Sequence, residues 1–171
     1  MTDFYIFRHG NTVNTEVGGI LSKLNIRIGG GSATLPILPI GVPALEKIGG
    51  YLKNVPTDAD FTSPFARCVE SSNIVGKITG RKYVPDERIR EYDGTRKDFS
   101  SFRERIDDFL DEIDKKNYSA VSICTHGAVI AAIKHLKLRQ KFHYVQALDF
   151  PRPGNLVIIK GGRIETLNFN K

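Results

Sequence analysis

The chain has 171 residues, 40% of them hydrophobic and 26% charged, which is typical of one globular domain covering residues 1–171. No apolar run is long enough to span a membrane, and the acidic start, Met1 to Asp3, lacks the basic region of a signal peptide, so we expect a cytoplasmic protein without a membrane partner. The net charge of +6 is spread along the chain, and its densest stretch, residues 134–141, is typical of a solvated helix end. Because no nucleic-acid-binding motif accompanies this charge, nucleic acid is not an expected partner.

Strands and helices alternate along the sequence. Runs rich in β-branched and aromatic residues predict strands at residues 3–7, 60–63, 120–125 and 156–160, with a hairpin partner at 163–168. Apolar residues at a period near 3.6 predict helices at residues 42–53, 65–78, 99–116 and 127–138. The sequence therefore predicts an α/β fold, a three-layer α/β/α sandwich around a mostly parallel, doubly wound sheet.

Two features that suggest other kinds of site are given structural interpretations. Residues 28–32 are rich in glycine, but no lysine and no helix follow as in a phosphate-cradling loop, so a flexible connection is expected. The two cysteines, Cys68 and Cys124, are too few for a disulfide framework and lie at no zinc-ligand spacing, so we expect reduced, buried thiols and no metal site.

Charged and titratable side chains lie where the predicted strands end. Arg8 and His9 end the first strand, His126 follows the strand at 120–125, and Arg67 opens the helix after the strand at 60–63. Sheets of this class bind ligands at the carboxyl ends of their parallel strands. We therefore expect both histidines at the same rim of the sheet, although they are far apart in sequence.

These residue types suit a phosphate monoester. Arginine offers planar, always-charged donors to phosphate oxygens. A neutral imidazole can attack phosphorus and form a phosphohistidine, while a second histidine stabilises the transferring group. A carboxylic acid can protonate the leaving alkoxide and then activate water. Because arginine and histidine supply the positive charge, this chemistry needs no metal.

Several segments resemble, in order, motifs of the histidine phosphatase superfamily, whose members are phosphoglycerate-mutase-like. Arg8-His9-Gly10 resembles its RHG signature. The other matching segments are 41–46 (G-x-x-A), 63–67 (S-P-x-x-R), 89–94 (L-x-E), 124–127 (the second histidine box) and 153–157 (the turn into the final strand). Because these segments are spaced from residue 8 to residue 157, the resemblance extends over nearly the whole chain.

The resemblance implies a role for five residues. By position, His9 is the phosphorylated nucleophile, Arg8, Arg67 and His126 bind the phosphoryl group, and Glu91 is the general acid/base. It also implies the doubly wound fold predicted above, and no cofactor. Glu87 and Asp93 compete with Glu91 for the carboxylate role.

The sequence departs from the family pattern after the nucleophile. Many members have an asparagine six residues after the nucleophilic histidine, in contact with the phosphoryl group. Thr15 occupies that place here and Asn14 comes one residue early, so both are candidate substrate-binding residues. The stretch from 18 to 35 is also more glycine-rich than usual, and its shape over the site is left open.

A second departure is the short interval between Glu91 and His126. In many members this interval carries helices that cap the active site, whereas here most of the cap is missing. A mutase must keep its intermediate away from water, so an open site favours a hydrolase. Open access also admits a bulky phosphoprotein as substrate, besides a small phosphate ester.

The leading hypothesis is a metal-independent phosphatase that acts through a phosphohistidine on His9. Glu91 favours alkyl phosphates, whose leaving groups need a proton. The alternatives are a phosphoglycerate-mutase-type transferase, a phosphohistidine or phosphoprotein phosphatase, and a phospholigand-binding module with little turnover. The sequence does not name the substrate or the oligomeric state.

Overall fold

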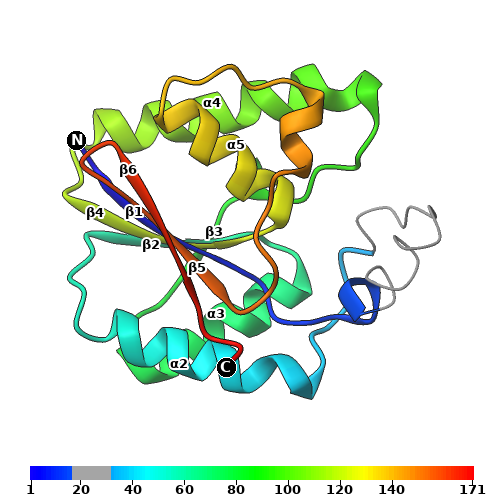
Figure 1. Cartoon of the computed structure of the whole chain (residues 1–171). Helices are drawn as coiled ribbons and strands as arrows, with labels where there is room; N and C mark the ends of the chain where they lie inside the picture. The colour runs from blue at the N-terminus through cyan, green and yellow to red at the C-terminus, as the bar shows by residue number, and fades with distance from the viewer. Residues whose placement is uncertain (17–31) are drawn as a thin grey trace.

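A computed structural model describes residues 1–16 and 32–171 of the chain. It contains one six-stranded sheet with helices on both faces (Figure 1), which confirms the predicted α/β sandwich. Most of the glycine-rich stretch at 28–32, predicted as a flexible connection, lies outside the described residues. None of the helices in the two described ranges has the length and apolar character needed to cross a membrane.

The sheet is parallel in its central part and antiparallel at one edge. Its strand order is β3-β2-β4-β1-β5-β6. Strands β1, β2, β3 and β4 run parallel, whereas β5 pairs antiparallel with β1 and β6 pairs antiparallel with β5. The strands are β1 (Asp3–Arg8), β2 (Ala59–Thr62), β3 (Val84–Pro85), β4 (Ala120–Thr125), β5 (Asn155–Lys160) and β6 (Arg163–Asn168).

Two helices cover each face of the sheet (Figure 1). Helices α2 (Val42–Leu52) and α3 (Ala66–Thr79) pack on one face, and α4 (Phe99–Lys115) and α5 (Gly127–Lys137) on the other. Short 3₁₀ helices connect them: η1 (Pro39–Gly41), η2 (Glu87–Ile89), η3 (Arg96–Asp98) and η4 (Tyr144–Leu148). The predicted helices and longer strands match these bounds to within about two residues, because their apolar periods are those of their buried faces.

The alternating side chains of the central strands fill two hydrophobic cores. On β1, Phe4 and Ile6 face the core under α4 and α5, while Tyr5 and Phe7 face the core over α2 and α3. Every residue of β4 is buried. A strand covered on both faces reads as a continuous apolar run, as expected for parallel sheets between helix layers.

The pairing of β1 with β4 determines where the functional residues meet. Arg8 is the register partner of Thr125, so His9 and His126 come next on adjacent parallel strands. The backbone N–H of His9 continues the ladder by donating to the carbonyl of Thr125 at 3.0 Å. The register therefore brings the two histidines to the same rim.

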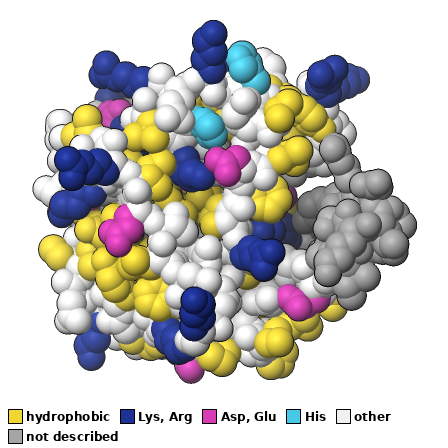
Figure 2. Space-filling model, viewed as in Figure 1, with side chains coloured by type: hydrophobic (Ala, Val, Ile, Leu, Met, Phe, Trp, Pro, Cys, Tyr) yellow, Lys and Arg dark blue, Asp and Glu magenta, His cyan; other side chains and the backbone are white. Residues whose placement is uncertain are grey.

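Charge is distributed over the surface without one dominant basic patch on the visible face. Figure 2 shows Lys and Arg side chains scattered among acidic and hydrophobic ones. This distribution agrees with the sequence-based interpretation of the net charge as a solvated surface.

Candidate active site

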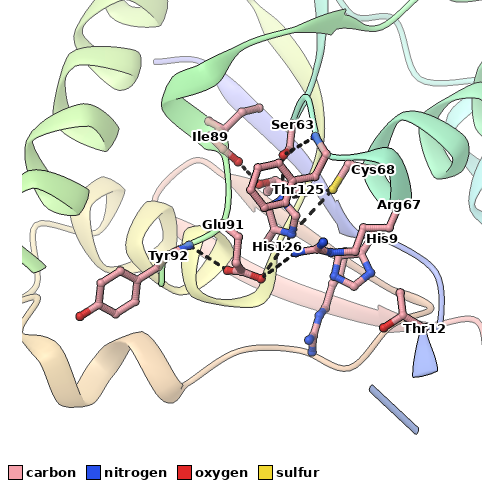
Figure 3. Close-up of polar contacts among 12 residues, drawn as sticks. His9, Thr12, Ser63, Arg67, Cys68, Ile89, Glu91, Tyr92, Thr125 and His126 are labelled. Carbon is pink, nitrogen blue, oxygen red and sulfur yellow. Dashed lines mark hydrogen bonds and ion pairs between the residues drawn. The ribbon is translucent and has the colours of Figure 1, made fainter. Parts of the chain in front are cut away.

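Residues from four segments converge at the carboxyl ends of β1, β2 and β4 (Figure 3). His9 follows β1, His126 follows β4, Arg67 lies in the first turn of α3, and Glu91 lies in the loop after η2. The rings of His9 and His126 are 5.3 Å apart between centroids, with an angle of 62° between their planes. The residues predicted from four separate motifs thus form one cluster.

Within the described residues, one ring nitrogen of His9 has a hydrogen-bond partner and the other has none. Its Nδ1 lies 2.8 Å from the carbonyl oxygen of Gly10, where only a protonated nitrogen makes a hydrogen bond. In the neutral ring the lone pair is then on Nε2. Burial lowers the pKa of His9 well below 6.5, and the positive charges of Arg8 and His126 lower it further. The neutral, nucleophilic form is therefore the stable one at neutral pH.

His126 is fully buried and contacts polar groups with both ring nitrogens. Nε2 is 2.7 Å from the hydroxyl of Ser63, and Nδ1 is 3.3 Å from Oε2 of Glu91. Burial alone lowers the pKa of His126, but the charges of Cys68 and Glu91 outweigh burial and raise it to about 9. His126 is also the residue that precedes helix α5, whose N-terminal dipole favours an anion. The two histidines are therefore held in opposite protonation states.

Arg8 has a buried donor that faces no acceptor in the part of the chain that the structure describes. Its Nη1 donates to the carbonyl of Pro151 at 3.0 Å, and its guanidinium lies 4.9 Å from the centroid of the Phe150 ring. Its Nε is buried and has no hydrogen-bond partner among residues 1–16 and 32–171. A buried donor without a partner is costly, so this nitrogen is suited to an oxygen of a bound anion.

Arg67 is almost completely buried beside the other charged groups. Its Nη1 donates to the carbonyl of Ser32 at 3.1 Å, and its Nη2 is 3.7 Å from Oε2 of Glu91. The ring of Phe65 stacks on its guanidinium at 5.0 Å. These contacts hold a second permanent cation close to His126 and Glu91.

Glu91 is ionised in this arrangement. Burial raises the pKa of its carboxyl group, but the contact with His126 and the charges of Arg8 and Arg67 outweigh burial and lower it. Arg105 of α4 donates to the carbonyl of Glu91 at 3.0 Å, and Thr125 donates to the carbonyl of Ile89 at 2.7 Å. Helix α4 and the end of β4 therefore fix the loop that carries this carboxylate.

The competing acids lie elsewhere. Glu87 and Asp93 are exposed, and neither has a contact with the histidines in the described structure. Asp93 instead accepts a hydrogen bond from the backbone of Thr95 at 2.7 Å. The geometry thus favours Glu91 among the three candidates.

Asn14 and Thr15 have different local environments from the five site residues described above. The hydroxyl of Thr15 accepts from the N–H of Thr12 at 2.7 Å and donates to the Thr12 carbonyl at 2.9 Å, so it closes a local turn. Asn14 is half-buried in the same turn. The assignment of either residue to substrate stays a prediction.

Sequence reasoning did not predict the direct contacts that Ser63 and Cys68 make with His126, although Cys68 adjoins Arg67 in sequence. Ser63 belongs to the motif that ends in Arg67, and its hydroxyl contacts His126 directly. Cys68 is buried as predicted, but its Sγ lies 3.5 Å from Nε2 of His126. Burial raises the pKa of this thiol, and its contacts with Cys124 and His126 outweigh burial and lower it to about 5. The available signal was the place of both residues beside the end of β2, where parallel strands present their ligands.

The cluster also has a donor set that metals use. One ligand atom each from His9, Glu91 and His126 lie within 4.8 Å of one another. Two imidazoles and a carboxylate suit a divalent metal such as Zn²⁺. The two arginines and the cationic His126 oppose a metal at this place and favour an anion.

Comparison with solved structures finds several proteins of similar fold, some of which are phosphatases by title. The structure of Bacillus stearothermophilus YhfR has 19% sequence identity and a TM-score of 0.72, and 100% of each chain is covered. The alpha-ribazole phosphatase from Shigella flexneri has 13% identity and a TM-score of 0.73, covering 99% of this chain and 96% of that one. A mycobacterial glucosyl-3-phosphoglycerate phosphatase, solved with VO3, has 15% identity and a TM-score of 0.72, covering 98% and 97%.

A comparison with curated protein sequences finds no match. The family model of the histidine phosphatase superfamily (branch 1) matches residues 4–98. This range includes Arg8, His9, Arg67 and Glu91, and the sheet places His126 beside them. The chain therefore belongs to the histidine phosphatase superfamily.

Proposed function

We propose that this protein is a metal-independent phosphatase that hydrolyses phosphate monoesters through a phosphohistidine on His9. The observation that carries the proposal is the state of His9. Its Nδ1 is engaged by the Gly10 carbonyl, its pKa is lowered well below 6.5, and its ring faces that of the cationic His126. A neutral imidazole with one free lone pair among cations is suited to attack a bound phosphate ester.

In the first step, Nε2 of His9 attacks phosphorus while the bond between phosphorus and the ester oxygen breaks. The phosphoryl oxygens accept hydrogen bonds from Arg8, Arg67 and His126, whose positive charges stabilise the transition state. The buried Nε of Arg8 supplies one of these donors. The products of the step are phosphohistidine and an alkoxide that needs a proton.

Glu91 supplies that proton after its pKa changes on binding. In the free protein its carboxylate is ionised by its cationic neighbours. A phosphate dianion placed beside it adds negative charge, which raises its pKa and favours protonation. After the proton transfer the carboxylate is restored, and it can then accept a proton from the water that attacks phosphohistidine. Inorganic phosphate and free His9 complete the cycle.

The interval after Glu91 favours transfer to water over transfer to a second substrate. Between Glu91 and His126 the chain forms η3, α4 and β4, with one α-helix, which packs on the sheet. A phosphoglycerate mutase must protect its intermediate from water, and a helix that belongs to the core does not form a cover. A mutase activity therefore remains the less favoured function.

The test is turnover of p-nitrophenyl phosphate in the presence of EDTA. We expect full activity with the chelator and a loss of at least about a thousandfold in His9→Ala. The matched control is His135→Ala, which removes a histidine of α5 that contacts Asp149 and Phe142 and none of His9, Glu91 and His126 among the described residues. Rapid quenching should trap an acid-labile phosphoryl adduct in the wild type and none in His9→Ala. Undiminished turnover in His9→Ala would show that His9 is not the nucleophile. Loss of activity with EDTA would show that a metal ion, rather than the arginines alone, supplies the positive charge.

A further inference from the structure

The loop between η4 and β5 exposes apolar side chains beside the candidate phosphate site. Phe150 is 41% exposed, and Val145 and Leu148 of the preceding η4 are 66% and 54% exposed. Single exposed apolar residues are common, but three within six residues form a group. Figure 2 shows hydrophobic side chains gathered at the upper right of the molecule, over the region that η4 occupies in Figure 1.

Phe150 is held in place despite its exposure. On one side of it, the carboxylate of Asp149 accepts from Nζ of Lys134 at 3.1 Å. On the other side, the carbonyl of Pro151 accepts from Arg8. These two contacts on neighbouring residues hold the backbone on both sides of Phe150.

The ring of Phe150 lies directly at the phosphate-binding residues. The Arg8 guanidinium is 4.9 Å from its centroid. A Cβ atom on Gly127 would lie 2.7 Å from Cγ of Phe150, so the ring packs on the backbone of the residue that follows His126. Phe150 thus contacts one phosphate-binding side chain and the backbone beside another, while two fifths of its surface stay open.

We infer that Phe150 is a specificity residue that stacks against the alcohol part of the substrate. The preferred substrates are then phosphate esters that carry an aromatic ring or a flat apolar group close to the phosphate. A phosphate bound by Arg8 places its ester oxygen near the exposed ring, and an aromatic side chain already fixed in position binds a second ring without loss of its own conformational freedom. This inference rests on the proposed function, because it assumes that Arg8 binds the phosphoryl group.

Phosphonates test the inference by binding alone. They keep the phosphorus–carbon bond intact, so calorimetry with benzylphosphonate and ethylphosphonate requires no turnover. We expect the wild type to bind benzylphosphonate about fivefold more tightly than ethylphosphonate. In Phe150→Ala this ratio should fall to about one, while the affinity for inorganic phosphate stays the same.

The matched control is Tyr51→Ala. Tyr51 is 39% exposed, like Phe150, but lies in the last turn of α2 and packs edge-on against Phe169. This variant should keep the wild-type ratio. In turnover, benzyl phosphate and ethyl phosphate should show the same selectivity, and because both have alkyl leaving groups, their demand on Glu91 is alike.

The possible outcomes separate this inference from the proposed function. An unchanged ratio in Phe150→Ala, or no preference in the wild type, would overturn the stacking role and leave the phosphatase proposal standing. A parallel loss of affinity for all three anions in Phe150→Ala would show that the ring only orients Arg8. If the wild type binds neither phosphonates nor phosphate, the phosphate site itself is wrong, and both proposals fall.

Discussion

Strands β4 and β6 have the same length and belong to the same sheet, but they differ in burial, in their position in the sheet and in what they contribute to the candidate site. All six residues of β4 are buried, whereas β6 has four exposed and two half-buried residues. Strand β4 lies between β2 and β1, and β6 forms the edge of the sheet. Directly after β4 comes His126, while β6 contributes no residue to the candidate active site.

The difference shows that different strands of one sheet have different roles. The central parallel strands position the residues of the candidate site, and the edge hairpin contributes to stability and solubility. Parallel strands between two helix layers end at a common rim, where a polar residue finds neighbours from several segments. The antiparallel hairpin adds a covering strand whose charged side chains, such as Arg163 and Glu165, discourage edge-to-edge pairing. Three predictions test this division, in order of expected size.

The largest effect, on turnover, is expected in the loop that carries Glu91, which Thr125 at the end of β4 holds by a hydrogen bond to Ile89. Glu91→Gln should reduce turnover of ethyl phosphate by about a hundredfold or more, because the alkoxide then leaves without a proton. Turnover of p-nitrophenyl phosphate should fall much less, since its leaving group departs unaided. The control is Glu87→Gln, an exposed neighbour, which should change neither rate. Equal losses on both substrates in Glu91→Gln would exclude the acid role.

The two strands should also differ in stability. Ile123→Ala on β4 removes a fully buried side chain and should lower the free energy of unfolding by about 3 kcal/mol. Ile164→Ala on β6 removes a half-buried one and should cost about 1 kcal/mol. Urea unfolding followed by circular dichroism measures both. Similar costs for the two variants would mean that the edge hairpin is as tightly packed as the centre.

The smallest effect at neutral pH is expected from Cys68. Its charge is the first of the contributions that raise the pKa of His126 to about 9, so activity should decline as pH rises through about 9 and His126 loses its positive charge. In Cys68→Ser this alkaline decline should move towards pH 6.5, the ordinary value for histidine. Cys124→Ser keeps a donor to Cys68 and serves as the control. A profile of kcat/KM against pH with an unshifted alkaline limb in Cys68→Ser would show that the thiol carries no charge there.

Most of the fold follows from local patterns in the sequence. Helix α4 was predicted as 99–116 and is observed as Phe99–Lys115, because Phe102, Ile106 and Phe109 repeat at the helical period and face one core. Strand β3 was missed. It has only two residues, one of them Pro85, and its pairing with β2 depends on the tertiary structure rather than on its own sequence.

Site residues that belong to a sequence motif were predictable. Residues that reach the site only through tertiary packing were not. His9 and His126 come together as expected, because each directly follows one of two parallel strands that pair in register, Arg8 opposite Thr125. The contact of Cys68 with His126 required the orientation of α3 on the sheet, which no local pattern gives. Phe150 lies more than twenty residues from any predicted site residue in sequence, and its contact with Arg8 spans nearly the whole chain.

The in-register pairing of Arg8 with Thr125 has a consequence for how the chain tolerates change. A single inserted residue in either strand would turn all later side chains to the opposite face, and it would offset the two histidines by one step along the sheet. The same ladder of backbone hydrogen bonds thus sets the spacing of the two imidazole rings and determines which side chains face each hydrophobic core. We expect an inserted residue to be tolerated in the hairpin turn at Gly161-Gly162, whereas an inserted residue within β1 should disrupt both the core and the candidate site.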